Sequence, residues 1–147
     1  MVDAESLSEC ALLHATIDEG QRLDGLNLGI VRRTRRRLDI DGCSIPAGTI
    51  VNAQVRHRHL DPDLFEAPER FCPEHFLGAR LPPDDFAPFG GGYRRCLGAP
   101  FATFELQVLL ATIVRRVQLR APPGLLVNRA QHGAFPGPSN EIPLQVL

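Results

Sequence analysis

The N-terminal part of the chain has the apolar spacing of an amphipathic helix. The order Ser-Leu-Ser-Glu at residues 6–9 is typical of a capping box, whose first and last side chains bind free amides at a helix start. Apolar side chains then recur with a helical period, at Ala11, Leu12, Ala15, Ile17 and Leu23. The pattern predicts a helix from about residue 7 to about residue 23.

The next part of the chain alternates between apolar and polar positions in short runs. Residues 23–37 lack a helical period and include two glycines, so a loop and an extended segment are expected. Residues 38–41 alternate as a strand, Gly42 favours a turn, and residues 43–49 resemble a second short strand. A third alternating run, residues 49–55, predicts another strand.

Prolines dominate residues 57–88 and exclude long regular elements there, because proline lacks the amide proton that helices and sheets use. They stand at Pro62, Pro68, Pro73, Pro82, Pro83 and Pro88. Phenylalanines recur through the same segment, at Phe65, Phe71, Phe76 and Phe86. A disordered linker is poor in such side chains, so we expect an irregular segment that is nevertheless packed.

Helical periodicity returns after Gly98. Pro100 suits the first turn of a helix, while Arg115 and Arg116 suit the last turn, where the helix dipole favours positive charge. The apolar positions between them predict a helix over about residues 98–117; they are Phe101, Phe104, Leu106, Val108, Leu109, Ile113 and Val117. Short strands are expected near residues 117–121 and 142–147.

Composition narrows the protein class. The 147 residues suffice for one domain with a core, and a net charge of -1 gives no argument for nucleic acid or an anionic membrane. We see no signal peptide and no apolar run of about 18 residues, so we expect a cytoplasmic protein without a membrane span. All 16 basic residues are arginine, which is typical of GC-rich bacterial coding sequences. The cysteines form no C-x-x-C pair and are expected to be free thiols: Cys10, Cys43, Cys72 and Cys96.

Cys96 lies directly before the second predicted helix and directly after Arg94 and Arg95. The free amides and the dipole of a helix start favour a thiolate, and the two arginines add positive charge. Three glycines at residues 90–92 allow a tight turn or the close approach of a flat ligand. A thiolate is both a soft metal ligand and a nucleophile. The alternative is a buried, inert cysteine at a helix start.

The stretch FGGGYRRCLG, residues 89–98, resembles the haem-binding signature of the cytochrome P-450 family. Its signature positions match at Phe89, Gly92, Arg94, Cys96 and Gly98. The resemblance implies that Cys96 is the axial thiolate of the iron of haem b. It implies that Arg94 pairs with a haem propionate and that Phe89 packs against the macrocycle. Gly92 and Gly98 would allow the turn and the close packing.

Three further segments stand in the same order as in the family. Glu19 and Arg22 resemble its Glu-x-x-Arg pair, and their spacing places both side chains on one helix face, although an ordinary surface pair is the alternative. DGCSIPAGTIV, residues 41–51, resembles its short hairpin, and residues 58–77 resemble the meander before the haem loop. The implied fold is α+β, the C-terminal part of the cytochrome P-450 fold, with residues 1–147 as a single partial domain.

Arg32 lies ten residues before Gly42, where family members carry a propionate-binding arginine. The resemblance implies that Arg32 is a second clamp on the haem, because a guanidinium binds carboxylates bidentately. The neighbouring arginines leave Arg33 open, and a solvated basic stretch is the alternative for most of them. Residues 27–31 resemble a segment that lines the substrate pocket; plain core packing is the alternative for Leu28, Ile30 and Val31.

The sequence departs from the family in one residue and in extent. The family completes its Glu-x-x-Arg pair with a second arginine, whereas the aligned position here is His75, with Arg70 as the other candidate. Histidine is only partly charged near neutral pH, so a weaker pairing is expected. The resemblance covers roughly the last third of a complete domain, without the helix that carries an acid–threonine pair above the haem. No catalytic residue of that oxygen side is identified.

The resemblance implies an oxidoreductase that hydroxylates a small apolar substrate with O2. Its electrons would come from NAD(P)H through a ferredoxin-type partner. That partner could bind a positive surface formed by Arg94, Arg95, Arg115 and Arg116, with an ordinary solvated face as the alternative for the last two. One alternative is a truncated, catalytically inactive haem-binding remnant or interaction domain. Another is a zinc site from Cys72, His75 and Cys96, although their spacing is unconventional for zinc.

Overall fold

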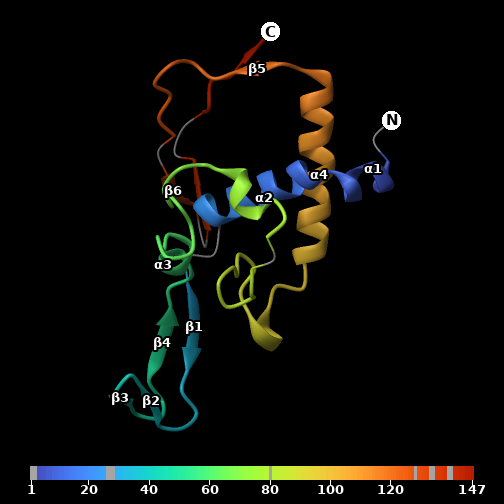
Figure 1. Ribbon diagram of the computed structural model, residues 1–147. Coiled ribbons are helices and arrows are strands. Elements are labelled where there is room, and N and C mark those ends of the chain that lie inside the picture. The colour runs from blue at the N-terminus through green and yellow to red at the C-terminus, as the bar shows by residue number, and fades with distance from the viewer. Residues whose placement is uncertain (1–2, 26–28, 80, 128, 133–134, 139–140) are drawn as a thin grey trace.

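The computed structural model describes residues 3–25, 29–79, 81–127, 129–132, 135–138 and 141–147. Helices α2 (Ala11–Asp24) and α4 (Ala99–Arg116) contact each other and cross near the middle of α4 (Figure 1). An arm of short strands extends away from this crossing. Residues 89–98, called the cysteine loop below, lie next to the N-terminal end of α4. Helices and antiparallel strand pairs therefore coexist, as the α+β expectation requires.

The first predicted helix is two helices, so its expected start and continuity were wrong. Helix α1 (Ala4–Glu9) starts after Asp3, whose carboxylate accepts the Ser6 amide at 2.8 Å. Asp3, and not Ser6, is therefore the cap, because it stands one position before the helix and can reach a free amide there. At Cys10 the backbone leaves helical geometry, with φ -80° and ψ 83°, and α2 begins at the next residue.

The strand arm consists of two antiparallel pairs. Strand β1 (Ile30–Arg33) pairs with β4 (Ile50–Ala53), and Arg32 stands opposite Val51. Strands β2 (Leu38–Ile40) and β3 (Cys43–Ile45) form the tip of the arm (Figure 1). Asp41 and Gly42 connect them with positive φ angles of 47° and 78°, a conformation that Asp and Gly tolerate better than most residues. The predicted hairpin is confirmed.

The third predicted strand ends earlier than expected, and a short helix follows it. Helix α3 (Val55–His59) begins at the residue where the alternating pattern predicted the strand to end. Its first and last side chains, Val55 and His59, are both buried. They lie four positions apart and therefore share one helix face, so burial of that face favours the helix.

The proline-rich segment is irregular and packed, as expected. It contains a short 3-10 helix, η1 (Pro73–Phe76), which contacts α2, and a second one, η2 (Gly92–Arg94), follows the segment. Phe65 is 1% exposed, and its ring centroid lies 6.0 Å from that of Phe76. Phe76 in turn lies 4.7 Å from Phe86. Phe65, Phe76 and Phe86 thus form the packing of a segment that lacks long regular elements, whereas Phe71 is 57% exposed and lies outside this packing.

The C-terminal part follows α4 as two strand pairs. Strand β5 (Leu119–Arg120) pairs with β8 (Gln145–Val146), which confirms the two strands predicted near the end of the chain. Strands β6 (Arg129–His132) and β7 (Phe135–Pro138) form a hairpin that the sequence pattern did not predict, because its glycines and prolines read as loop. None of the helices described is long and apolar enough to cross a membrane.

Candidate functional site

The loop before α4 folds back on itself through two glycines. Gly90 and Gly92 have φ angles of +75° and +63°, which lie in the left-handed region that side chains disfavour. The Cys96 amide donates to the Phe89 carbonyl at 3.0 Å, and the Arg95 amide donates to the Gly92 carbonyl at 3.1 Å. These bonds bring the Phe89 and Cys96 backbones together, so the signature residues form one folded loop.

Cys96 is an exposed, free cysteine at the start of α4. Its carbonyl accepts the Ala99 amide at 3.3 Å, and the Gly98 carbonyl accepts the Ala102 amide at 2.9 Å. A Cβ added at Gly98 would lie 3.8 Å from the Cys96 sulfur, an ordinary contact. The described chain therefore imposes no steric demand for glycine at Gly98, although the resemblance implied one.

The arginines expected near a haem are exposed. The Arg94 guanidinium forms no hydrogen bond with the described residues. Arg33, in contrast, donates to the Gly48 carbonyl at 3.1 Å within the strand arm. Arg32 donates to the Val31 carbonyl at 2.9 Å. Arg32 shares a strand face with Ile30, because side chains two positions apart in a strand point the same way. Ile30 lines a pocket together with Gly91 of the cysteine loop, which favours Arg32 over Arg33 as the residue on the loop side.

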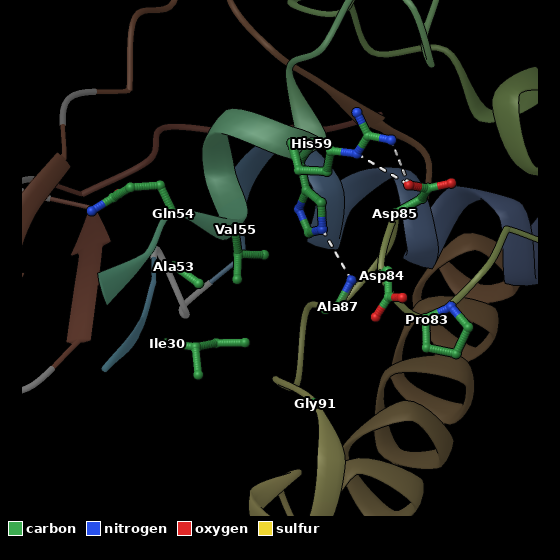
Figure 2. Close-up of a pocket in the computed structure, with 11 residues that line it drawn as sticks. Ile30, Ala53, Gln54, Val55, His59, Pro83, Asp84, Asp85, Ala87 and Gly91 are labelled. Atoms are coloured by element: carbon green, nitrogen blue, oxygen red, sulfur yellow. Dashed lines mark hydrogen bonds and ion pairs between the residues drawn. The ribbon is translucent and has the colours of Figure 1, made fainter. Parts of the chain in front are cut away.

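Residues 27 and 28, and with them the expected pocket residue Leu28, lie outside the described part of the chain. Of the two remaining apolar candidates in that segment, Ile30 is half-buried and Val31 is 59% exposed. The pocket that Ile30 lines has a volume of about 230 Å³ and lies between α3, the β1–β4 pair and residues 83–91 (Figure 2).

Glu19 and Arg22 form a buried ion pair rather than a surface pair. Their exposed fractions are 0% and 1%. Arg22 Nε donates to Glu19 Oε2 at 2.7 Å, and Arg22 Nη2 donates to Glu19 Oε1 at the same distance. This bidentate geometry matches the guanidinium to the carboxylate and fixes the orientation of both side chains.

The remaining guanidinium protons bind backbone carbonyls of distant segments. Nη1 of Arg22 donates to the carbonyls of His59 and Pro68 at 2.6 and 2.7 Å, and Nη2 donates to the Arg70 carbonyl at 3.2 Å. The Phe65 ring covers the guanidinium at 4.7 Å. Arg22 therefore ties α2 to α3 and to the proline-rich segment, and among the described residues no buried polar side-chain atom lacks a partner.

His75, and not the side chain of Arg70, faces Glu19. His75 Nδ1 lies 3.3 Å from Glu19 Oε1, and its Nε2 lies 2.9 Å from the Glu66 carbonyl. Both ring nitrogens thus face acceptors, so the doubly protonated ring satisfies both contacts. Arg70 contributes only its backbone carbonyl to this cluster.

The surroundings of Glu19 set its pKa below the usual value. Burial acts in the opposite direction and would raise the pKa. Hydrogen bonds from Arg22 and from the Cys72 amide, at 2.8 Å, stabilise the carboxylate, and the Arg22 charge and His75 act in the same sense. Glu19 is therefore ionised at neutral pH, as its bidentate pairing requires.

The proposed zinc ligands do not come together. The Cys72 thiol donates to Glu74 at 3.1 Å, and His75 faces Glu19. Within the described ranges, no group of three His, Cys, Asp or Glu side chains could hold a metal ion. The zinc interpretation of Cys72, His75 and Cys96 is therefore wrong for this structure, because Cys72 and His75 bind different carboxylates and the three side chains form no common group.

Two buried residues of this region were missed from the sequence. Phe65 covers Arg22, and the His59 side chain accepts the Ala87 amide at 3.1 Å. The recurring phenylalanines of the proline-rich segment indicated packing but not this contact. For His59, the only signal was its four-residue spacing from apolar Val55, which becomes informative once a helix is assigned there.

Comparison with known proteins decides the family. Residues 2–143 match the sequence profile of the family described as cytochrome P-450. The chain belongs to the cytochrome P-450 family. It is similar to the protein named cytochrome P-450 135B1 of Mycobacterium bovis and Mycobacterium tuberculosis, with 39% identity over 107 residues, or 73% of this chain. It is also similar to cytochrome P-450 138 of the same species, with 43% identity over 75 residues, or 51% of this chain.

A solved cytochrome P-450 has the same fold over the length of this chain. The match to the retinoic acid bound cyanobacterial CYP120A1 has a TM-score of 0.87 and 29% identity, and covers 100% of this chain but 35% of that structure. The chain likewise spans 23% of cytochrome P-450 135B1 and 17% of cytochrome P-450 138. It therefore corresponds to part of the fold of these relatives, and complete family members are haem monooxygenases.

Proposed function

We propose that this chain forms the thiolate-ligand side of a haem site, in which Cys96 would hold the iron of haem b. The observation that carries the proposal is the exposed Cys96 thiol on a loop folded by two left-handed glycines. The donor set fits the group, because a soft thiolate suits haem iron and exposed arginines suit the propionates. Bound haem iron would supply O2 activation for a monooxygenase reaction in the complete family domain.

The residues of this chain would bind and orient the haem. Arg94 and Arg32 are exposed and would pair with propionates, and Phe89 would pack against the macrocycle. The carbonyl of Phe89 already accepts the Cys96 amide, which orients the loop that carries the thiol. Gly92 would let the loop turn close to the haem, because a side chain there would strain its left-handed backbone.

The buried cluster would support this loop indirectly. Glu19, Arg22 and His75 hold the segment that precedes the loop against α2. A small apolar substrate would be hydroxylated with electrons from NAD(P)H, delivered by a ferredoxin-type protein. Exposed arginines near the loop and at the end of α4 would attract such an acidic partner: Arg94, Arg95, Arg115 and Arg116.

Titration of the chain with ferric haem tests the ligand assignment. Wild type is expected to bind haem with the electron paramagnetic resonance signature of a thiolate ligand, and Cys96→Ala is expected to lose it. Cys43→Ala is the matched control, because Cys43 is also an exposed, free thiol but lies at the tip of the strand arm. An unchanged signature in Cys96→Ala would refute the assignment.

A second candidate function is a haem-binding or interaction domain without turnover of its own. The exposed apolar side chains of α4 favour it, since exposed apolar surface of this extent is typical of a protein contact: Phe101, Phe104, Leu109, Ile113 and Val114. Substrate-dependent NADPH oxidation, measured with a ferredoxin and its reductase, separates the two. Oxidation coupled to hydroxylated product supports the monooxygenase, and its absence in a haem-loaded chain supports the binding domain.

A further inference from the structure

His59 connects the buried ion pair to the cysteine loop. It is the last residue of α3, and its side chain is 3% exposed. Its ring points toward the segment before the loop, where the Ala87 amide donates to Nε2 at 3.1 Å (Figure 2). Phe86 packs beside the ring, with centroids 5.2 Å apart. At the backbone, the His59 carbonyl accepts Arg22 Nη1 at 2.6 Å.

The bond to Ala87 requires the neutral form of the ring. A backbone amide can only donate, so Nε2 must carry a lone pair and the ring proton must sit on Nδ1. Protonation of Nε2 would place two N–H groups face to face. The contact can therefore exist only while His59 is uncharged, in contrast to His75, whose nitrogens both face acceptors.

The surroundings of His59 favour this neutral form. Burial lowers its pKa, a hydrogen bond with the backbone of Arg22 raises it, and the charge of Arg22 lowers it again, with a net lowering. The other charged groups near the ring belong to its own helix and to the facing segment. They are Arg58, which forms ion pairs with Asp85 at 2.7 Å and with Asp61 at 2.6 Å, and exposed Asp84 at the pocket.

Ala87 stands at the entrance of the cysteine loop. Its carbonyl accepts the Gly90 amide at 3.0 Å, and two residues later the Phe89 carbonyl accepts the Cys96 amide. A continuous series of hydrogen bonds thus runs from Arg22 through His59 and Ala87 to the backbone of the loop. Loss of the His59–Ala87 bond would free the entrance of the loop while the Glu19–Arg22 pair remains intact.

We propose that His59 is a positioning residue for the cysteine loop and that protonation of its ring releases the loop entrance. The proposal adds a positioning residue to the haem-thiolate function. Only its consequence for haem release depends on that function. A group with a lowered pKa contributes stability above its unfolded pKa of about 6.5, and this stability is lost as pH falls towards the folded pKa. The loop is therefore expected to be held at about pH 7.5 and released under mild acid.

Hydrogen exchange of the Ala87 amide in the 147-residue chain tests the contact without haem. Protection is expressed relative to an unstructured chain at the same pH. It is expected to fall by up to about tenfold for each pH unit below about 6.5, where the ring gains a proton on release, and to level off below the lowered pKa of the held ring. His59→Gln should retain protection at low pH, because its side-chain oxygen accepts without titrating. His57→Gln is the control, since His57 is an exposed histidine of the same helix.

The exchange experiment decides the proposal by itself. Acid-dependent protection of Ala87 in wild type that becomes acid-independent in His59→Gln supports it. Protection that ignores pH in wild type, or an Ala87 amide unprotected at every pH, overturns it. In the haem-loaded chain, release of haem should accelerate with acid in wild type and less in His59→Gln. If neither wild type nor His59→Gln binds haem, the proposed haem function is refuted. The role of His59 is then decided by the hydrogen-exchange result alone.

Discussion

At the scale of single residues, the buried guanidinium of Arg22 organises the centre of the described structure. It binds the Glu19 carboxylate with two hydrogen bonds and three carbonyls with the others. A charge taken out of water is costly unless it is paired and its protons are all bonded. Arg22 meets both conditions, so removal of either partner should be far more harmful than loss of an exposed pair.

Glu19→Gln is expected to destabilise the chain by about 3–5 kcal/mol, because it leaves the buried charge of Arg22 without its counter-ion. Urea denaturation measures the change as a lower midpoint or a lost cooperative transition. Asp39→Asn is the control, since its pair with Arg37 is exposed and contributes little. Equal midpoints for the two variants would contradict a structural role for the buried pair.

His75→Arg is expected to slow the loss of haem from the loaded chain. Arginine stays charged at all relevant pH values and can bind Glu19 with two donors, whereas His75 offers one at 3.3 Å. Transfer of haem to an excess of apomyoglobin measures the rate. Arg70→Gln should leave the rate unchanged, because only the carbonyl of Arg70 contacts the cluster. A His75→Arg rate equal to wild type would show that this contact does not support haem retention.

The sequence predicted the partnership of Glu19 and Arg22 but not its burial. Helical spacing places the two side chains on one face, and this local rule is visible in the sequence. Their burial depends on carbonyls of residues 59, 68 and 70, which approach only after the proline-rich segment has folded over α2. His59 went unnoticed for the same reason, since its partner Ala87 lies 28 residues away.

At the scale of elements, the sequence predicted segments that have a strong apolar period or are bounded by proline or turn residues. It did not predict the shortest elements. The apolar period and Pro100 identified α4, and the turn expected at Gly42 identified the β2–β3 hairpin. The break at Cys10 and helix α3 were missed, because a helix of five or six residues makes fewer than two turns and shows no repeated period. Tertiary packing decides such elements, as the buried side chains of α3 show.

Two glycine-to-alanine substitutions should have opposite effects on stability, because one glycine has a left-handed backbone and the other lies inside a helix. Gly92→Ala is expected to cost about 1–2 kcal/mol, because its φ of +63° disfavours any Cβ although no atom blocks the space. Gly20→Ala, in the interior of α2 with equally open space, is expected to stabilise by about 0.5–1 kcal/mol. Thermal unfolding compares the two. A stabilising Gly92→Ala would show that the loop does not require the left-handed backbone.

At the scale of the whole molecule, much of the apolar surface remains outside the core. Helix α4 buries Ala99, yet several of its large apolar side chains are more than half exposed, namely Phe101, Leu109 and Val114. The chain corresponds to 35% of the solved cytochrome P-450 to which it is similar. Partial packing of its apolar surfaces is expected for a chain that matches only part of that fold.

The isolated 147-residue chain is therefore expected to self-associate as its concentration rises. Sedimentation velocity should show larger species at higher concentration, and Phe101→Gln combined with Leu109→Gln should reduce them because both side chains are exposed. Glu105→Gln, an exposed polar position on the same helix, should have no such effect. A monomer at all concentrations would contradict a role for this face in association.

The most direct test of the central claim is the absorption spectrum of the haem-loaded chain after reduction under carbon monoxide. A cysteine thiolate opposite carbon monoxide shifts the Soret band strongly to the red relative to a histidine ligand. Wild type and Cys43→Ala are predicted to show this band, and Cys96→Ala is predicted to lack it. A red-shifted band that persists in Cys96→Ala, or its absence from haem-loaded wild type, would contradict Cys96 as the iron ligand.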